Sequence, residues 1–279
     1  MNWSVTVLEY GYVDRFPASN LFAAQPNEGY RRMPYCFGLL RSAGRCILVD
    51  TGFHDPAVHR RLTGKYGRTQ WARPVDVLAR VGVRPEQVDT ILLTHNHFDH
   101  AGCVGDFPGA HVWIQRREID AYVAAAARPA RFEFLTRSCQ ADLPALLDAR
   151  RATLVDGHAT VAPGVSLRPA HDTHTAGSQV VAVGPWVFAG DNVYSYENLE
   201  GLHGDGILAP IAMTTGSASR WLDFADELLT SVDGDTSRVL PFHEAALWDR
   251  FPTTVGPDGL HIAEISTVDS SLQVSTRKP

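Results

Sequence analysis

One short segment constrains this chain more than any other: Thr-His-Asn-His-Phe-Asp-His-Ala-Gly, at positions 94–102. It places His95, His97, Asp99 and His100 directly after an apolar Ile-Leu-Leu run, which predicts a buried strand. Burying imidazoles and a carboxylate without partners is costly, and these groups are the ligands of zinc and similar metal ions. The two alternating histidines can face one way from an extended backbone, and the other two residues follow a turn. We therefore expect two ligand groups and two metal ions.

This H-x-H-x-D-H pattern resembles the motif of the metallo-β-lactamase superfamily, and the resemblance implies three further ligands. His174, Asp191 and His243 match them, and each follows a strand-like run. His171 is the competing candidate for the first position, but Thr-Ala-Gly follows His174, which favours His174 as the ligand. Asp50, in a Val-Asp-Thr-Gly turn, is implied to orient a ligand instead of binding metal.

The resemblance also implies how the ligands divide between the two ions. One ion is expected at His95, His97 and His174, the other at Asp99, His100 and His243, with Asp191 bridging them. Zinc is the expected metal, with manganese, cobalt or iron as alternatives. A water that bridges two such ions loses a proton near neutral pH and attacks an electrophilic carbonyl as hydroxide. A metal-dependent hydrolase is therefore expected.

Length and composition agree with a single domain over residues 1–279, although this exceeds the usual size of a domain. Hydrophobic residues make up 44% of the chain, which is enough for a sizeable core. There is no apolar stretch of about 20 residues and no signal-peptide pattern at the start, so we expect a cytoplasmic protein without a membrane span. The net charge of −6 argues against a nucleic-acid partner. The four cysteines form no C-x-x-C pair and are expected to be reduced thiols.

Short strands and helices alternate along the chain. Strands are expected at 4–10, 35–41, 45–50, 90–93, 111–114, 165–169, 179–183, 187–190 and 239–242, and helices at 56–62, 74–81, 116–127, the second part of 130–151, and 217–229. The resemblance implies that these elements form an αββα sandwich, in which two mixed β-sheets pack face to face between outer helices.

The substrate is indicated by weaker features. Tyr194 stands three residues after Asp191, and Glu-Asn follows shortly after it, as in the N-acyl-homoserine lactonase branch of the superfamily. The resemblance implies that this tyrosine hydrogen-bonds the lactone carbonyl and that Asp99 also protonates the departing alkoxide. Ala176 and Ser178 depart from the branch's usual residues, which weakens assignment to acyl-homoserine lactones in particular. Packing at a strand edge is the alternative role for Tyr194.

The segment 16–34 is rich in proline and carries Arg31 and Arg32. It is expected to be a lid, a contact arm in a homodimer, or a solvated surface loop. If the two arginines face the metals, the substrate carries a carboxylate.

Four functions compete at this point. The first is a lactonase that acts on a small molecule with a ring carbonyl. The second is a glyoxalase II-like thioesterase or a cyclic-amide hydrolase. The third is a di-iron redox protein, for which 279 residues leave no room for the usual flavin domain. The fourth is a regulatory or nucleic-acid-processing protein, which the acidic balance disfavours.

Overall fold

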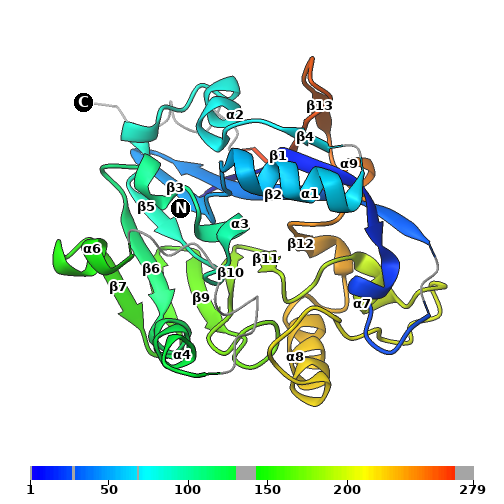
Figure 1. The fold of residues 1–279 in the computed structure, drawn as a ribbon. Coiled ribbons are helices and arrows are strands. Elements are labelled where there is room, and N and C mark those ends of the chain that lie inside the picture. Colours follow the sequence, from blue (N-terminus) through cyan, green and yellow to red (C-terminus); the bar gives the residue numbers. More distant parts are fainter. Residues whose placement is uncertain (1, 27–28, 68, 130–142, 268–279) are drawn as a thin grey trace, which may run out of the picture.

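The structure is a computed structural model that describes residues 2–26, 29–67, 69–129 and 143–267. Two β-sheets and the helices around them account for most of these residues (Figure 1). The helices are α1 (Pro56–Tyr66), α2 (Pro74–Arg80), α3 (Phe98–Ala101), α4 (Arg116–Ala126), α6 (Leu143–Asp148), α7 (Tyr196–Glu200), α8 (Ala218–Ser231) and α9 (Leu247–Arg250).

The larger sheet has the strand order β13-β14-β1-β2-β3-β5-β6-β7, with β4 paired to β1. Its strands are β1 (Ser4–Pro17), β2 (Tyr30–Ser42), β3 (Arg45–Val49), β4 (Thr69–Trp71), β5 (Thr90–Leu92), β6 (His111–Gln115), β7 (Ala152–Val155), β13 (Thr253–Val255) and β14 (His261–Ser266). The four strands from β3 to β7 run parallel, so their carboxyl ends meet at one edge of the sheet.

The smaller sheet has the order β12-β11-β10-β9-β8. Its strands are β8 (Ala159–Ala162), β9 (Val165–Pro169), β10 (Gln179–Val183), β11 (Trp186–Gly190) and β12 (Val239–Pro241). Strands β9 and β11 are both antiparallel to β10, and β12 is parallel to β11. The strands β9, β11 and β12 therefore point the same way, and each ends just before a proposed ligand.

The two sheets pack face to face through one apolar cluster. Val49 and Leu92 of the larger sheet and Val181, Phe188 and Leu240 of the smaller sheet are buried in it. The sheets approach so closely that a Cβ atom added at Gly38 would lie 2.6 Å from the Phe188 ring. The contact fixes the position of one sheet relative to the other.

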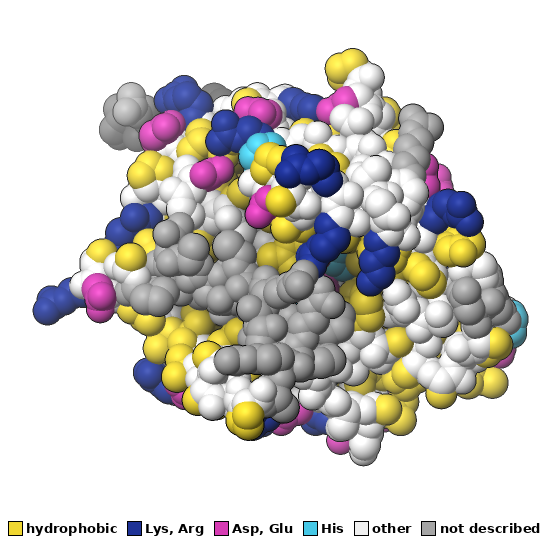
Figure 2. Space-filling model, in the orientation of Figure 1, with side chains coloured by type: hydrophobic (Ala, Val, Ile, Leu, Met, Phe, Trp, Pro, Cys, Tyr) yellow, Lys and Arg dark blue, Asp and Glu magenta, His cyan; other side chains and the backbone are white. Residues whose placement is uncertain are grey.

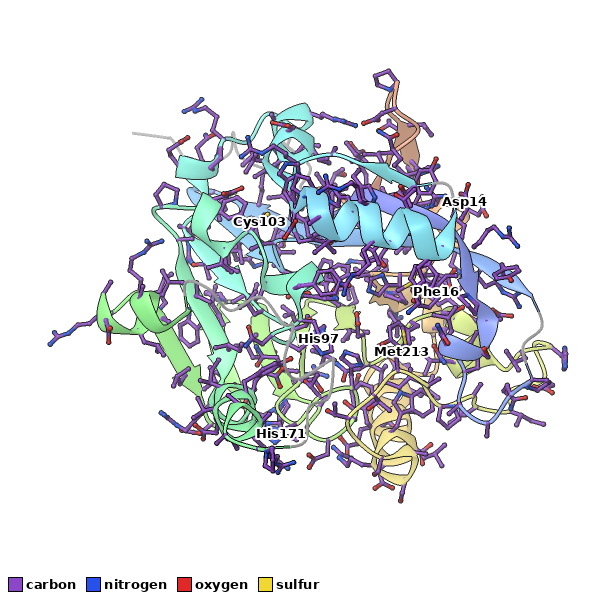
Figure 3. All side chains as sticks on the ribbon, in the orientation of Figure 1. Asp14, Phe16, His97, Cys103, His171 and Met213 are labelled. Carbon is purple, nitrogen blue, oxygen red and sulfur yellow. The ribbon has the colours of Figure 1, made fainter. Side chains whose placement is uncertain are left out.

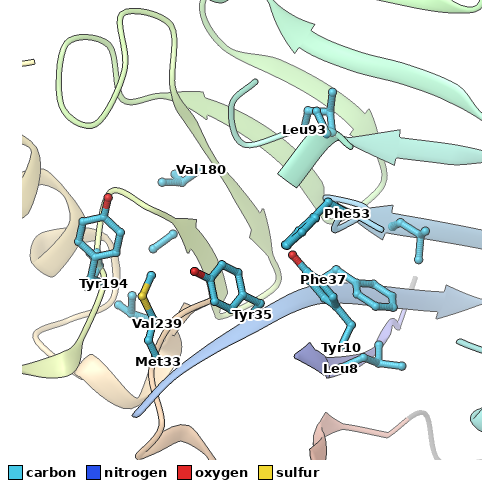
Figure 4. Packing of buried hydrophobic residues seen from close by; sticks show 14 of the residues in the cluster. Leu8, Tyr10, Met33, Tyr35, Phe37, Phe53, Leu93, Val180, Tyr194 and Val239 are labelled. Carbon is cyan, nitrogen blue, oxygen red and sulfur yellow. The ribbon is translucent and has the colours of Figure 1, made fainter. Parts of the chain in front are cut away.

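A second cluster packs helices onto the sheets. Helix α1 lies against β1, and its Leu62 and Tyr66 are buried (Figure 1). Figure 4 shows this core from close by, with Tyr10 and Phe53 on one side of Tyr35 and Met33 and Tyr194 on the other. The expected αββα sandwich is therefore confirmed.

Several expected elements are longer than the sequence indicated. Strands β1 and β2 extend into the segment 16–34, so its described ends form a long hairpin: Phe16 pairs with Arg31, and Pro17 with Tyr30. Residues 16–17 and 30–34 of that segment belong to the sheet, and Ala18–Asn20 forms a 3-10 helix after β1. Its role as a lid stays a prediction. Its contact with a second copy of the chain stays a prediction. The first part of 130–151 lies outside the described residues, and the second part contains α6 as expected.

No helix among the described residues is long and apolar enough to cross a membrane.

Candidate metal centre

Seven proposed ligands gather at the edge where the carboxyl ends of strands from both sheets meet. They form two groups, in each of which one donor atom per residue lies within 4.8 Å of the others: His95, His97, His174 and Asp191 in the first, and Asp99, His100 and His243 in the second. All seven residues are buried. These are the two groups that the sequence predicted.

Asp191 joins the two groups through its two oxygens. Its Oδ2 lies 3.8 Å from His95 Nε2 and 3.4 Å from His174 Nε2. Its Oδ1 lies 2.9 Å from His100 Nε2 and 3.1 Å from His243 Nε2. A single carboxylate thus faces a set of imidazole nitrogens on each side, as a ligand shared by two metal ions must.

The donor atoms that face the centre lack good hydrogen-bond partners. Among the described residues, the Nε2 atoms of His95, His100 and His243 and the Oδ1 of Asp191 form no hydrogen bond of acceptable geometry. Buried polar atoms are rarely left in this state, because each costs about 1–3 kcal/mol. The residues therefore fit metal ions, which would satisfy all of these atoms at once.

The opposite nitrogens of the same rings are held from behind. His100 Nδ1 lies 2.7 Å from Asp50 Oδ2, and His243 Nδ1 lies 2.7 Å from the Pro34 carbonyl oxygen. These contacts fix which ring nitrogen faces the centre, a support typical of metal-bound histidines. Asp50 takes the orienting position that its turn indicated, and it also accepts hydrogen bonds from the Thr94 backbone and hydroxyl.

Burial and nearby charges shift the pKa values of the histidines in opposite directions. Burial lowers the pKa of His95 well below its usual value and that of His174 to about 4, so both rings are neutral at pH 7. Burial would lower the pKa of His100 too, but the negative charges of Asp191, Asp99 and Asp50 raise it well above the usual value. Burial opposes ionisation of Asp191, yet His100, His243 and His174 hold its pKa well below the usual range. The centre is thus an ionised carboxylate surrounded by imidazoles.

Local backbone geometry brings the strand ends together. Gly190 has φ of +55°, and a Cβ atom there would lie 2.6 Å from Thr94 Oγ1, so only glycine allows the end of β11 to lie against the end of β5. Asp191 follows this glycine directly and so lies next to the loop that carries His95 and His97.

His171 lies outside both groups. Its ring is partly buried, and its Nε2 lies 3.3 Å from Gln115 Oε1. Figure 3 shows His171 beside α4, well away from His97. His174 therefore lies within the first group of donors, and His171 does not.

A cavity of about 170 Å³ opens onto the centre. His97, Asp99, His174 and Asp191 line it together with Tyr194. Its wall is mainly apolar and comes from residues distant in sequence: Phe16, Met33, Tyr35, Leu62, Tyr66, Phe98 and Met213. Arg61 and Lys65 of α1 complete the lining. Figure 3 shows Phe16 and Met213 on the same side of His97.

Arg31 and Arg32 do not line this cavity. Arg31 pairs with Glu197 at 3.5 Å, and Arg32 pairs with the buried Glu9 at 2.6 Å and lies over the Tyr12 ring. The sequence left open whether these arginines face the metals, and the structure turns them elsewhere. Basic side chains do border the cavity, but they come from α1.

The buried carboxylate of Glu118 escaped the sequence analysis. Glu118 accepts hydrogen bonds from the Asn96 and Gly177 backbone nitrogens and from the Thr175 hydroxyl, at 2.8–3.0 Å. It therefore ties the loop of His95 and His97 to the loop of His174. The only sequence signal was a glutamate in the first turn of a helix, which ordinarily indicates an interaction with the helix dipole.

Comparison with known proteins decides the family. Residues 37–243 match the family model described as the metallo-beta-lactamase superfamily, which is more than half of the chain. The chain belongs to this superfamily. Its two buried ligand groups are consistent with a dinuclear metal site.

Similar sequences within the superfamily are N-acyl homoserine lactonases. A Bacillus cereus lactonase is 35% identical over 48% of this chain and 51% of its own length. A lactonase from a Bacillus species is 31% identical over 60% of this chain and 66% of its own length. The matched stretch therefore covers between half and two thirds of these relatives.

Solved structures of the superfamily share the fold. Bacillus thuringiensis AiiA with N-decanoyl-L-homoserine bound at its active site superposes with a TM-score of 0.64, at 22% identity over 88% of this chain and 95% of that one. A probable metal-dependent hydrolase from Staphylococcus aureus gives a TM-score of 0.68, at 17% identity over 87% of this chain and 89% of that one.

Proposed function

We propose that this protein is a dinuclear zinc hydrolase that opens a lactone, with N-acyl-homoserine lactones as one candidate class. The similarity to named lactonases at 30–35% identity supports the proposal. The observation that carries it is the position of Tyr194, which stands three residues after Asp191 and lines the cavity over the metal centre.

The environment of Tyr194 suits a hydrogen-bond donor. Burial, with the negative charges of Asp191 and Asp99, raises the pKa of its hydroxyl well above the usual value, so the hydroxyl keeps its proton. It donates to the Met213 carbonyl oxygen at 2.9 Å and lies 3.3 Å from His174 Nδ1. A substrate carbonyl in the cavity would compete with Met213 for this proton.

The backbone of Tyr194 is held rigidly. Asn198 Oδ1 accepts hydrogen bonds from the backbone nitrogens of Tyr194 and Ser195, at 3.0 and 2.9 Å. The Asn198 amide in turn donates to the Ala209 carbonyl oxygen at 2.7 Å. Asn198 of the Glu-Asn pair thus positions the tyrosine, and a fixed donor stabilises developing charge better than a mobile one.

The residues around the cavity divide the work of ring opening. Bound zinc ions would polarise the ester carbonyl and lower the pKa of water. Tyr194 would donate to the carbonyl oxygen as charge develops there, and Asp99, which lines the cavity, would take a proton from the attacking water and pass it to the departing alkoxide as the ring C–O bond breaks. The apolar wall would hold the remainder of the substrate and exclude bulk water.

A substrate panel tests this function. Zinc-loaded protein is assayed with lactones of different ring size and acyl chain, with thioesters of glutathione type and with cyclic amides, each beside Asp191→Ala as the inactive control. The proposal expects the highest kcat/KM for a lactone. A thioester or a cyclic amide as the best substrate would instead favour the corresponding hydrolase.

A further inference from the structure

Two basic side chains of α1 lie at the cavity over the metal centre. Arg61 and Lys65 both line it, and both are exposed. They are four residues apart on a helix, so their Cβ atoms lie roughly 5–6 Å from one another on one side of it. Figure 2 shows basic side chains gathered over a hollow in this face of the molecule.

The helix that carries them is fixed in place. Leu62 and Tyr66, each one residue further along, are buried and line the same cavity, and the Tyr66 ring packs against Phe16 at 4.8 Å between centroids. At the start of α1, Asp55 accepts hydrogen bonds from the backbone nitrogens of Ala57 and Val58. The backbone that carries the two side chains is thus fixed before a ligand arrives.

The charge of Arg61 is within electrostatic reach of a tyrosine beside the centre. The Arg61 charge acts on the Tyr35 hydroxyl, where it opposes the rise in pKa that burial causes. The Tyr35 ring in turn packs edge-on against His243, with centroids 5.0 Å apart. Lys65 Nζ lies 4.9 Å from the Tyr66 ring centroid and forms no ion pair with a described carboxylate.

The cavity lining therefore combines three kinds of group: metal-ligating residues, an apolar wall, and the two cations Arg61 and Lys65. The protein as a whole carries a formal charge of −6, so its overall field repels anions, and a local cation pair is needed to offset this for an anionic substrate. A guanidinium with an ammonium beside it suits a carboxylate, which accepts two hydrogen bonds from arginine.

We infer that Arg61 and Lys65 bind a carboxylate on the substrate, so the preferred lactone carries an acid group joined to its ring through an apolar part. The inference rests on the proposed lactonase function and narrows its substrate class. The expected substrate therefore differs from N-acyl-homoserine lactones, whose substituent on the lactone ring carries no charge.

A matched pair of substrates tests the inference. One lactone carries a carboxylate at the end of an apolar substituent, and the other carries the primary amide in its place. The wild-type protein should open the acid with a kcat/KM about tenfold higher, which corresponds to about 1.4 kcal/mol. The preference should shrink as ionic strength rises to about 1 M, where the Debye length is about 3 Å.

Substitutions in α1 test whether Arg61 and Lys65 cause the preference for the acid over the amide. Arg61→Gln with Lys65→Gln should bring the acid-to-amide ratio close to one. Arg60→Gln is the control, because it removes one positive charge, as each of the two substitutions does, from an exposed position of the same helix that does not line the cavity. The ratio should stay at the wild-type value in that control. A preference that survives in the double variant, or that disappears equally in the control, overturns the inference.

A binding measurement separates this inference from the proposed function. The ring-opened products of the two lactones, one with a carboxylate at the end of its substituent and the other with the amide there, are titrated into zinc-loaded wild-type and variant proteins. Calorimetry detects their binding without turnover. Tighter binding of the acid, lost only in the double variant, supports carboxylate binding by Arg61 and Lys65. If neither lactone is hydrolysed in the same experiments, the lactonase proposal alone fails. Equal binding of the two compounds to wild-type protein rejects the cation pair, whatever the enzyme hydrolyses.

Discussion

At the scale of single residues, the position of the Tyr194 hydroxyl is compatible with two different roles. Its contact with His174 Nδ1 supports a metal ligand, whereas its place in the cavity lining suits a donor to substrate. The two roles differ in what they affect. A supporting role affects metal affinity, and a donor role affects the rate at saturating metal.

We therefore predict the effect of Tyr194→Phe, which keeps the ring and removes the hydroxyl. At saturating zinc the best lactone should be hydrolysed about tenfold more slowly, less than for a full oxyanion donor because metal also polarises the oxygen. Steady-state kinetics and metal analysis measure this. A wild-type rate at saturating zinc would leave the tyrosine with packing and ligand support only.

His171 and His174 offer a matched test of the ligand set. His174→Ala removes a first-group donor, so bound metal and hydrolysis should both fall sharply. His171→Ala removes a ring that contacts Gln115 and should leave about two ions per chain. Metal analysis of both purified variants decides the matter. Loss of metal in His171→Ala alone would reverse the assignment.

At the scale of elements, the first turn of α4 links two loops through Glu118. We predict that Glu118→Gln destabilises the metal-free protein by about 1–3 kcal/mol, because the amide nitrogen would face backbone or hydroxyl donors that now lack an acceptor. Zinc affinity should fall as well, since the same bonds position the ligand loops. Denaturant unfolding and zinc titration measure the two effects.

Glu264→Gln is the control for this variant, because Glu264 is exposed on β14. Unchanged stability and unchanged zinc affinity in Glu118→Gln would show that the loops hold their positions without this carboxylate.

The turn between β13 and β14 is tied to α2 by another ion pair. Arg80 donates to both carboxylate oxygens of Asp258, at 3.0 and 2.6 Å. This hydrogen bonding to Arg80, against a smaller opposing effect of burial, lowers the pKa of Asp258. The resulting stability is present above the unfolded-state pKa of about 3.9 and is lost as pH falls through the lower folded-state pKa.

We therefore predict that Asp258→Asn costs about 0.5–1 kcal/mol at neutral pH and almost nothing in strong acid. The free energies of unfolding of metal-free wild-type and variant proteins, compared at both pH values, give the answer. An equal cost at both would mean that the charge of Asp258 is not the source of the stability.

The sequence predicted most of these elements and the ligands His95, His97, Asp99 and His100 for a physical reason, whereas His174, Asp191 and His243 were implied by the family resemblance. A buried strand shows as an apolar run, and a cluster of imidazoles at its end has few explanations other than metal. Glu118, Arg61 and Lys65 gave no such signal, because a single acid or base on a helix is ordinarily a solvated residue. Their roles depend on which loops and cavity the fold brings beside them, and this is a long-range property.

At the scale of the whole molecule, metal should contribute to stability as well as to chemistry. We predict that a strong chelator abolishes hydrolysis and lowers the melting temperature, and that zinc, cobalt or manganese restores both. Ions that bind only the folded state stabilise it by about 2.7 kcal/mol at a free concentration 100 times Kd. Thermal unfolding and assays of the same samples measure this. Full hydrolysis by metal-free protein would exclude the proposed mechanism.

The origin of the ligands has one more consequence. Each group takes donors from both sheets. In the first group, His95 and His97 follow β5 of the larger sheet, and His174 and Asp191 follow β9 and β11 of the smaller sheet. In the second group, Asp99 and His100 also follow β5, and His243 follows β12 of the smaller sheet. An ion in either group would therefore act as a cross-link across the seam of the sandwich. A slide of one sheet along the other would distort both coordination spheres together. Zinc affinity therefore depends on how the two sheets are aligned. A core substitution far from the metal centre, for instance at the Gly38–Phe188 contact, should weaken zinc binding.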